Sequence, residues 1–318
     1  MSYLLLSGGL VMLIFGSNWL VDGASSLARK LNISDIVIGL TVVAFGTSSP
    51  ELVVNLIASF NGNTDIAIGN ILGSNIFNIL AILGITSLFL PVAVMNNTVW
   101  KEIPFSILAV LIVAFIANDV LIDGYEKNEI SRIDGLVLLG FFSIFMAYTF
   151  ILAKHSGPLM EVEKVSMSVP KSGLYVIVGL AGLFFGGRFL VMGAVEIARN
   201  FGMTESVIGL TVIAAGTSLP ELATSITAVL KKNSDIAIGN VVGSNIFNIF
   251  FILGSSAVIR PLPFSTGSNI DILAVLAASL LMFLFVFMGK GRKIDRFEGI
   301  ILLLLYVAYT VYLTVFSK

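Results

Sequence analysis

The sequence IVIGLTVVAFGTSSPELVVNLIASF, residues 36–60, recurs as SVIGLTVIAAGTSLPELATSITAVL at residues 206–230. The correspondence continues without a gap, so that residues 36–84 and 206–254 align with 31 identities in 49 positions. Each copy carries the same polar motif, Gly-Thr-Ser-x-Pro-Glu, within an apolar run. The chain therefore contains one unit of sequence twice.

The overall composition is that of a membrane protein. Apolar residues make up 57% of the 318 residues, only 12% are charged, and the mean hydropathy is +1.02. Soluble globular proteins do not reach such values. About 20 apolar residues cross roughly 30 Å of hydrocarbon. We therefore predict an all-α polytopic membrane protein with ten transmembrane helices, at 3–27, 36–60, 68–90, 103–118, 134–152, 173–198, 206–230, 237–259, 269–288 and 297–316.

The charge and the residue types exclude several other classes of protein. A net charge of −1 and a pI near 5.9 provide no basic surface of the kind that nucleic acid requires. Cysteine is absent, so no disulfide framework or thiolate metal site can form. The one histidine, His155, lies in a predicted connecting segment, where we expect it to be solvated. We predict no enzymatic activity, no resident cofactor, no nucleic-acid partner and no obligatory protein partner.

The duplication also predicts how the chain is divided. We assign residues 1–152 to a first five-helix repeat, 153–172 to a cytoplasmic linker and 173–318 to a second five-helix repeat. Because each unit has an odd number of spans, the second enters the membrane from the opposite side, and the repeats are inverted. Inverted repeats bring equivalent residues together near the membrane midplane. We therefore expect Glu51 and Glu221 to meet.

The distribution of Lys and Arg predicts the orientation in the membrane. If the N-terminus faces outward, twelve of these residues lie in inside segments and five in outside segments. Positively charged residues concentrate in cytoplasmic loops. We therefore expect a multi-pass protein of the cell membrane, surrounded by lipid, with both termini extracellular.

The repeated motif places ionisable groups at membrane depth. A carboxylate there costs about 2.5 to 3.5 kcal/mol on insertion scales, so it indicates a functional site. Each glutamate follows a proline, which has no amide hydrogen and frees a carbonyl of the preceding turn. A threonine four residues and a serine three residues before each glutamate share its helix face. The candidate ligands are the side chains of Thr47, Ser48, Glu51, Thr217, Ser218 and Glu221 and the carbonyl groups of Ala44 and Ala214.

The next helix of each unit carries a polar stripe with a spacing of four residues. Asn and Ser in such a stripe can hydrogen-bond across helices, and the neighbouring glycines permit close helix packing. We favour this packing role for Asn70, Asn75, Asn240 and Asn245. Because they are expected near the glutamates, we assign to the site the side chains of Ser74, Asn78, Ser244 and Asn248.

These candidates form a site made only of oxygen ligands. Carboxylate, hydroxyl, amide and carbonyl oxygens suit Ca²⁺ and Na⁺ better than Zn²⁺ or Cu²⁺. Two ionised glutamates are neutralised by one Ca²⁺ or by two Na⁺, so the cavity can hold either but not both, as an antiporter requires. A further Na⁺ would make the cycle electrogenic. Because the two carboxylates repel each other and are partly desolvated, H⁺ should compete.

The doubled Gly-Thr-Ser-x-Pro-Glu motif, followed by Gly-Asn and Gly-Ser-Asn-Ile-Phe-Asn in both copies, resembles the paired alpha-repeats of the prokaryotic sodium/calcium exchanger family. The resemblance covers essentially the whole chain. It implies alternating access, in which helices two, three, seven and eight form the ion site and the first helix of each repeat slides past that core. It carries ligand roles to Thr47, Ser48, Glu51, Ser74, Asn78, Thr217, Ser218, Glu221 and Ser244, and backbone-carbonyl roles to Ala44 and Ala214.

One position and two alternatives bear on this interpretation. Some relatives, including potassium-dependent exchangers, have Asp where this chain has Asn248, so the amide favours K⁺-independent exchange. The proton/calcium exchangers share the layout but typically lack the Thr-Ser-x-Pro-Glu sequence, and H⁺/Ca²⁺ antiport is the alternative function. A cation channel is disfavoured, because selectivity filters usually form from rings around a symmetric pore.

Overall fold

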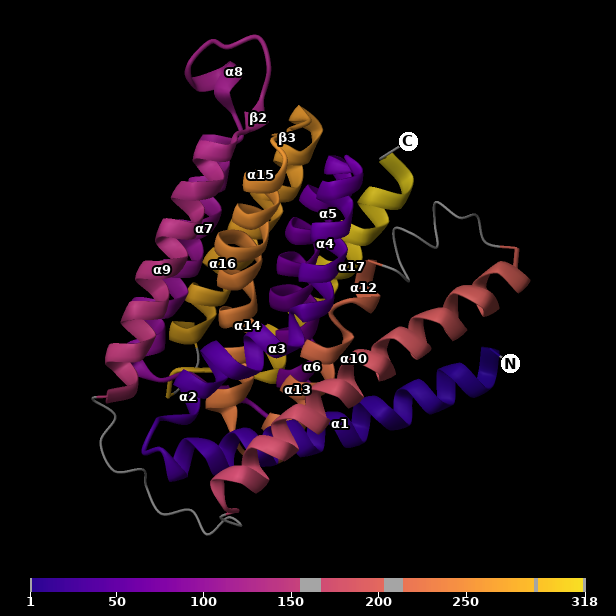
Figure 1. The fold of residues 1–318 in the computed structure, drawn as a ribbon, viewed down its shortest axis with the longest axis vertical. Coiled ribbons are helices and arrows are strands. Elements are labelled where there is room, and N and C mark those ends of the chain that lie inside the picture. Colours follow the sequence, from indigo (N-terminus) through magenta and orange to yellow (C-terminus); the bar gives the residue numbers. More distant parts are fainter. Residues whose placement is uncertain (1, 155–166, 203–213, 289–290, 317–318) are drawn as a thin grey trace.

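The structure is a computed structural model that describes residues 2–154, 167–202, 214–288 and 291–316 (Figure 1). These residues form a mostly helical bundle. Eight of the described helices are long and apolar enough to cross a membrane, and a bent pair of shorter helices would make a ninth. The prediction of a polytopic helical membrane protein is confirmed.

The tenth predicted helix and two other predictions fall partly or wholly outside the described residues. Residues 206–213 belong to the predicted helix 206–230, of which the described part contains the short apolar helix Leu219–Leu230. His155 and most of the predicted linker, residues 155–166, also lie outside the described residues.

The helices follow the predicted division closely. In the first half they are α1 (Ser2–Lys30), α2 (Asp35–Ile38), η1 (Gly39–Val43), α3 (Ala44–Thr47), α4 (Ser49–Asn61), α5 (Thr64–Ile76), η2 (Phe77–Ile82), α6 (Leu83–Phe89), η3 (Thr98–Glu102), α7 (Ile103–Ile116), α8 (Asp119–Ile122) and α9 (Arg132–Lys154). In the second half they are α10 (Val169–Asn200), α12 (Ala214–Gly216), α13 (Leu219–Leu230), α14 (Ser234–Ile246), η5 (Phe247–Leu253), α15 (Gly254–Ile259), η6 (Thr266–Ser268), α16 (Asn269–Met288) and α17 (Arg296–Phe316).

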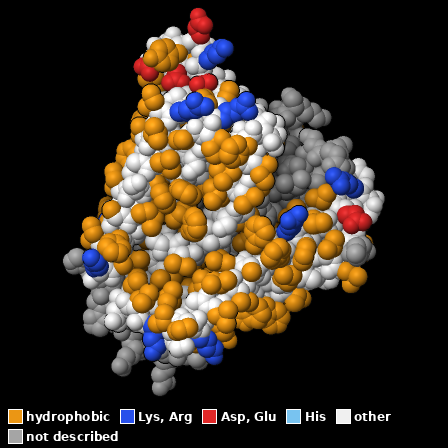
Figure 2. Space-filling view, viewed as in Figure 1, with side chains coloured by type: hydrophobic (Ala, Val, Ile, Leu, Met, Phe, Trp, Pro, Cys, Tyr) orange, Lys and Arg blue, Asp and Glu red, His pale blue; other side chains and the backbone are white. Residues whose placement is uncertain are grey.

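Burial separates central helices from peripheral ones. In the spans Ser234–Ile259 and Ile66–Phe89, 94% and 78% of the most apolar stretch is buried inside the molecule. The share is only 17% in Arg132–Lys154 and in Arg296–Val315. Figure 2 shows apolar side chains spread over the middle of one face, with charged side chains toward its edges. The centre of the bundle is therefore formed by α5, η2 and α6 and by α14, η5 and α15.

Helices α1 and α10 lie side by side across one end of the bundle (Figure 1). Glycines line their contact at seven-residue intervals. A Cβ on Gly9 would lie 2.5 Å from the backbone nitrogen of Leu190, and one on Gly179 would lie 2.6 Å from that of Leu20. The two backbones are therefore in direct contact along a stripe formed by Gly9, Gly16, Gly23, Gly179, Gly186 and Gly193.

Two short strand pairings connect the halves of the chain. Strand β1 (Val92–Ala93) pairs antiparallel with β4 (Lys293–Ile294), and β2 (Glu129–Ile130) pairs antiparallel with β3 (Leu262–Pro263). β1 and β3 follow α6 and α15, whereas β2 and β4 precede α9 and α17. Each pairing thus joins a strand of one half to the non-equivalent strand of the other half.

Candidate cation site

The first glutamate motif lies at a break between two helices. Helix α3 ends at Thr47 and α4 begins at Ser49, and the chain bends there by 47°. Pro50 occupies the first turn of α4 and cannot donate a main-chain hydrogen bond. The carbonyl group of Ala44 accepts from the backbone of Ser48 at 3.0 Å. The predicted kink is present.

The second motif has the same local design. Ala214 begins the short helix α12, and Thr217 and Ser218 form the turn before α13. The backbone nitrogen of Leu222 donates to the carbonyl oxygen of Ser218 at 3.1 Å, as Leu52 does to Ser48. Each glutamate is therefore held in the first turn of a helix that starts inside the molecule.

The two motifs contact each other through crossed hydrogen bonds. Ser218 Oγ donates to Glu51 Oε1 at 2.8 Å, and Ser48 Oγ donates to Glu221 Oε1 at 2.9 Å. Ser74 Oγ donates to the same Glu51 oxygen at 3.5 Å. Both glutamates are 1% exposed. The structure thus brings together the predicted residues Ser48, Glu51, Ser74, Ser218 and Glu221.

Several oxygens of this region are buried without a hydrogen-bond partner among the described residues. Buried polar groups are normally satisfied, so each such atom requires an explanation. Neither glutamate has a basic residue among its hydrogen-bonding partners. The remaining oxygens are free to bind cations. They are Glu51 Oε2, Glu221 Oε2, Asn78 Oδ1, Asn248 Oδ1 and Ser244 Oγ.

The orientation of two asparagines is fixed across the two copies. Asn78 Nδ2 donates to Asn245 Oδ1, and Asn248 Nδ2 donates to Asn75 Oδ1, both at 3.0 Å. Because each amide nitrogen is bonded to the opposite copy, each amide oxygen points away from that bond and is left as a ligand. The sequence analysis assigned Asn75 and Asn245 to packing. They also orient two candidate ligands, which the repeated Ser-Asn-Ile-Phe-Asn sequence could have indicated.

Thr47 lies in a hydrogen-bond network beside the site. Its Oγ1 lies 3.0 Å from the carbonyl oxygen of Val43 and 3.0 Å from Asn240 Oδ1. Asn240 Nδ2 in turn donates to the carbonyl oxygen of Glu221 at 3.1 Å. Asn70 makes a comparable packing contact, since its Nδ2 donates to Asn55 Oδ1. Asn240 therefore packs as predicted and also links the two motifs.

Three π-helical segments adjoin the site, and no sequence pattern predicted them. Segment η1 ends directly before Ala44, η2 includes Asn78, and η5 includes Asn248. Such widened turns are frequent at functional sites, because they shift side chains and carbonyl groups out of the regular register. Here they occur next to one candidate carbonyl and contain two candidate side chains.

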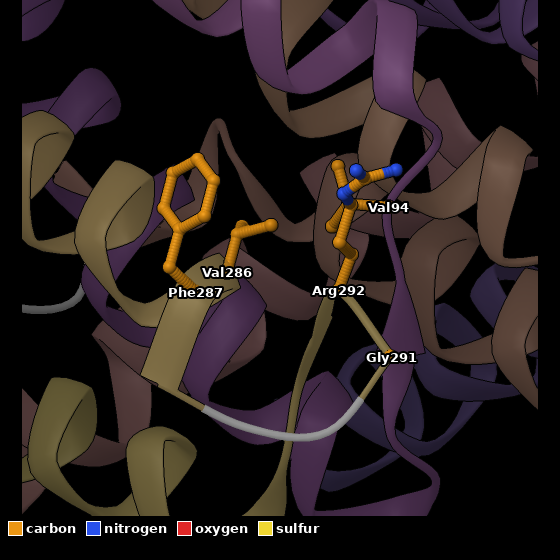
Figure 3. A pocket seen from close by; sticks show the side chains of 5 residues that line it. All are labelled: Val94, Val286, Phe287, Gly291 and Arg292. Atoms are coloured by element: carbon orange, nitrogen blue, oxygen red, sulfur yellow. The ribbon is translucent and has the colours of Figure 1, made fainter.

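The larger cavities of the molecule lie elsewhere. One of about 410 Å³ opens beside the β1–β4 pairing and is lined by Val94, Val286, Phe287, Gly291 and Arg292 (Figure 3). No predicted ligand lines it. A small gap that includes Ser48, Phe45 and Phe247 has no room for a water molecule. Within the described residues, no cluster of three or more His, Cys, Asp or Glu side chains could hold a metal.

A helical membrane bundle with two buried carboxylates at broken helices is the architecture of a secondary transporter for cations. The family model described as sodium/calcium exchanger protein matches residues 1–151 and 171–315. The chain belongs to this family, and it is a cation/Ca²⁺ antiporter rather than an enzyme. Na⁺ and Ca²⁺ are therefore cargo for a protein of this kind.

Similar proteins cover nearly the whole chain. The sodium/calcium exchanger MaX1 of Methanosarcina acetivorans is 33% identical over 98% of both chains. The membrane protein MJ0091 of Methanocaldococcus jannaschii is 38% identical over 94% of this chain and 93% of its own. A solved structure of the sodium-calcium exchanger NCX_Mj, soaked with Na⁺ and Sr²⁺, is 36% identical and covers 98% of this chain and 97% of its own, with a TM-score of 0.83.

Proposed function

We propose that this protein exchanges Na⁺ for Ca²⁺ across the cell membrane by alternating access, electrogenically and without K⁺. The observation that carries the proposal is the crossed hydrogen bonding of Ser48 with Glu221 and of Ser218 with Glu51. It joins two carboxylates from the two copies in one buried region. The similarity to MaX1 and to NCX_Mj supports the choice of ions.

The charge of the site accounts for exchange. Glu51 and Glu221 together carry two negative charges, which one Ca²⁺ or two Na⁺ would neutralise. The two ions therefore compete for the same oxygens, and binding of one requires release of the other. One additional Na⁺ bound outside this balance would move net charge in each cycle. A proton on either glutamate would weaken binding of both ions, so H⁺ would act as a competitor.

The proposed ligands extend over both copies. The side chains with unpartnered oxygens supply the direct contacts, and the hydroxyls that now bond to the glutamates can turn toward an ion. Because all are oxygen ligands, they match hard cations. The complete proposed set is Ala44, Thr47, Ser48, Glu51, Ser74, Asn78, Ala214, Thr217, Ser218, Glu221, Ser244 and Asn248, with Ala44 and Ala214 acting through their carbonyl groups.

The proposed architecture comprises ten transmembrane helices in two inverted five-helix repeats, 1–152 and 173–318, joined by a cytoplasmic linker. The exchange of strand partners between the two halves supports it, because equivalent strands of inverted units would pair in this crosswise way. We place both termini outside the cell. In the transport cycle, α1 and α10 would move past the site as one body.

Asn248 is the proposed reason for K⁺ independence. Its amide is neutral, so the central site holds two carboxylates rather than three. Replacing it by aspartate, Asn248→Asp, should change the Na⁺ or K⁺ dependence of Ca²⁺ transport. Transport by this variant can be measured with K⁺ present and absent on each side. An unchanged ion profile would contradict the role given to this residue.

The deciding experiment is Ca²⁺ uptake into proteoliposomes that are loaded with Na⁺ and diluted into Na⁺-free buffer, with a proton ionophore present. We expect uptake that requires internal Na⁺ and that generates a membrane potential. Uptake that appears only with an imposed pH gradient would indicate H⁺/Ca²⁺ antiport instead. Uptake without any counter-ion gradient would indicate a channel.

A further inference from the structure

A third glutamate is buried outside the site described above. Glu102 ends the π-helical segment η3, directly before α7, and is 1% exposed. The hydroxyl of Tyr148, on α9, donates to its Oε1. Its other oxygen, Oε2, is buried and has no hydrogen-bond partner among the described residues. No salt bridge of Glu102 is found among these residues. In these respects it resembles Glu51 and Glu221.

Two hydroxyls flank Glu102 on the same helix. Thr98 and Ser106 lie four residues before and after it, which places the three side chains along one face. Both are 1% exposed, and Thr98 Oγ1 and Ser106 Oγ also lack a hydrogen-bond partner among the described residues. Buried serine and threonine hydroxyls usually bond to a carbonyl of the preceding turn, as Thr149 does in α9. Three unsatisfied oxygens on one face therefore require a common explanation.

The local backbone adds a further oxygen. Pro104 lies in the first turn of α7 and has no amide hydrogen, so a carbonyl of the preceding turn lacks its usual main-chain donor. The helix widens to a π-helical turn at this point. Lys101, the neighbouring residue, is exposed and has its ammonium 5.8 Å from the ring centre of Tyr148. The cluster thus begins within one residue of the molecular surface.

The cluster is not part of the duplicated site. At the repeat offset of 170, the positions equivalent to Thr98, Glu102 and Ser106 hold Ser, Ile and Leu, so only the first half carries the carboxylate. Helix α7 nevertheless packs against α14 and η5, which carry Ser244 and Asn248. The cluster therefore lies one layer of helices away from the central site.

We propose that Thr98, Glu102 and Ser106 form a second cation site, which binds one Na⁺. The single carboxylate matches the charge of a monovalent ion, and the hydroxyl and carbonyl oxygens are the hard ligands that such an ion prefers. An ion there neutralises Glu102 and satisfies the three unpartnered oxygens together. Because α7 contacts α14 and η5, occupancy of this site would stabilise the packing around Ser244. The inference does not depend on the proposed exchange function.

The test uses the full-length protein with the central carboxylates removed by Glu51→Gln and Glu221→Gln. Its thermal unfolding is measured in detergent over a series of NaCl concentrations, against N-methyl-D-glucamine chloride at equal ionic strength. We expect a saturable, Na⁺-specific rise in Tm. Adding Glu102→Gln should weaken the apparent Na⁺ affinity by at least about tenfold. Absence of the Na⁺-specific rise, or a rise that Glu102→Gln leaves unchanged, would overturn the proposal.

Asp271 provides a matched control. Like Glu102, it is a carboxylate near the start of a membrane-spanning helix and accepts a hydrogen bond from a tyrosine, here Tyr309 at 2.7 Å. Unlike Glu102, it is only partly buried. Asp271→Asn in the same background should leave the Na⁺ effect intact. An equal loss in both variants would overturn the assignment to Glu102.

Two further variants keep the test decisive if Glu102→Gln fails to fold. Thr98→Val preserves the side-chain shape, and Ser106→Ala removes one oxygen, so neither leaves a buried charge without its ligand. Each should weaken the apparent Na⁺ affinity several-fold in the same background. Unchanged affinity in both variants would refute the site.

Discussion

The central helices and the α1–α10 pair are held together in different ways. In the centre, polar side chains bond across the two copies, as Asn78 does to Asn245 and Asn248 to Asn75. Between α1 and α10, glycines bring the two backbones into contact, with no side chain between them at the stripe. Directed hydrogen bonds fix the position of ligands, whereas a continuous backbone contact makes two helices move together.

The links between these two regions are few and uneven. Ser17 Oγ and Thr227 Oγ1 are 2.8 Å apart, and Asp22 Oδ1 lies 2.8 Å from Lys231 Nζ, so α1 is bonded to the end of α13. At the equivalent positions, α10 carries Gly187 and Met192, which cannot make such bonds. The repeat is therefore symmetric in its ligands but not in the contacts that hold its moving helices. The following variants test this contrast, beginning with the largest expected effect.

The largest effect should come from the central charges. Glu51→Gln and Glu221→Gln each keep the side-chain shape but remove half of the site's charge. Leaving a buried ion without its counter-charge costs about 3 kcal/mol or more, which corresponds to at least about a hundredfold weaker binding. We expect Ca²⁺ uptake by proteoliposomes to be abolished while the purified protein remains folded. Glu196→Gln, at an exposed position on α10, is the control, and near-normal exchange by either central variant would refute the shared site.

The glycine contact can be tested with adjacent residues of α1. A Cβ on Gly9 would collide with the backbone of α10, whereas a Cβ on Gly8 would meet no atom within 4 Å. Gly9→Ala should therefore destabilise the protein by about 1–3 kcal/mol through overpacking. Gly8→Ala should be neutral or slightly stabilising, because alanine favours the helix. Thermal unfolding of the two variants measures the difference, and equal Tm values would show that the backbones are not in firm contact.

A smaller effect is expected from the residues that orient the ligands. Asn75→Ala removes the acceptor for Asn248 Nδ2 without touching a proposed ligand. The loss of one hydrogen bond of about 1 kcal/mol should weaken Ca²⁺ affinity about fivefold. Asn70→Ala, which breaks a hydrogen bond to Asn55 instead, should leave the affinity unchanged. Calorimetric titration with Ca²⁺ compares the two, and equal losses would mean that Asn75 has no specific orienting role.

The smallest effect should come from the link between the regions. The side chains of Lys231 and Asp22 are 27% and 50% exposed, and an exposed ion pair contributes at most about 1 kcal/mol. Asp22→Asn should therefore change the rate of Na⁺-dependent Ca²⁺ uptake by less than about fivefold and leave Ca²⁺ affinity unchanged. A loss of transport comparable to that of Glu51→Gln would show that this link, and not the central site, limits the protein.

Much of this arrangement could be predicted from the sequence, because the duplication and the apolar spans are visible in it. The meeting of Glu51 with the opposite motif follows from an odd number of helices per copy. The π-helical turns could not be predicted, since they depend on packing around each helix. The orienting role of Asn75 depends on which atom of the opposite copy it meets. The glycine stripe was present in the sequence, but only the structure shows what each glycine faces.

The strand pairings have a consequence for the origin of the molecule. β1 of the first half pairs with β4, whose counterpart in its own half is β2, and β2 pairs with the counterpart of β1. Under the proposed inverted arrangement, a single five-helix polypeptide inserted in both orientations would form both pairings with a second copy of itself. The two halves are thus related as the subunits of a homodimer that later became one gene product, and fusion of the chains required no new contact between them.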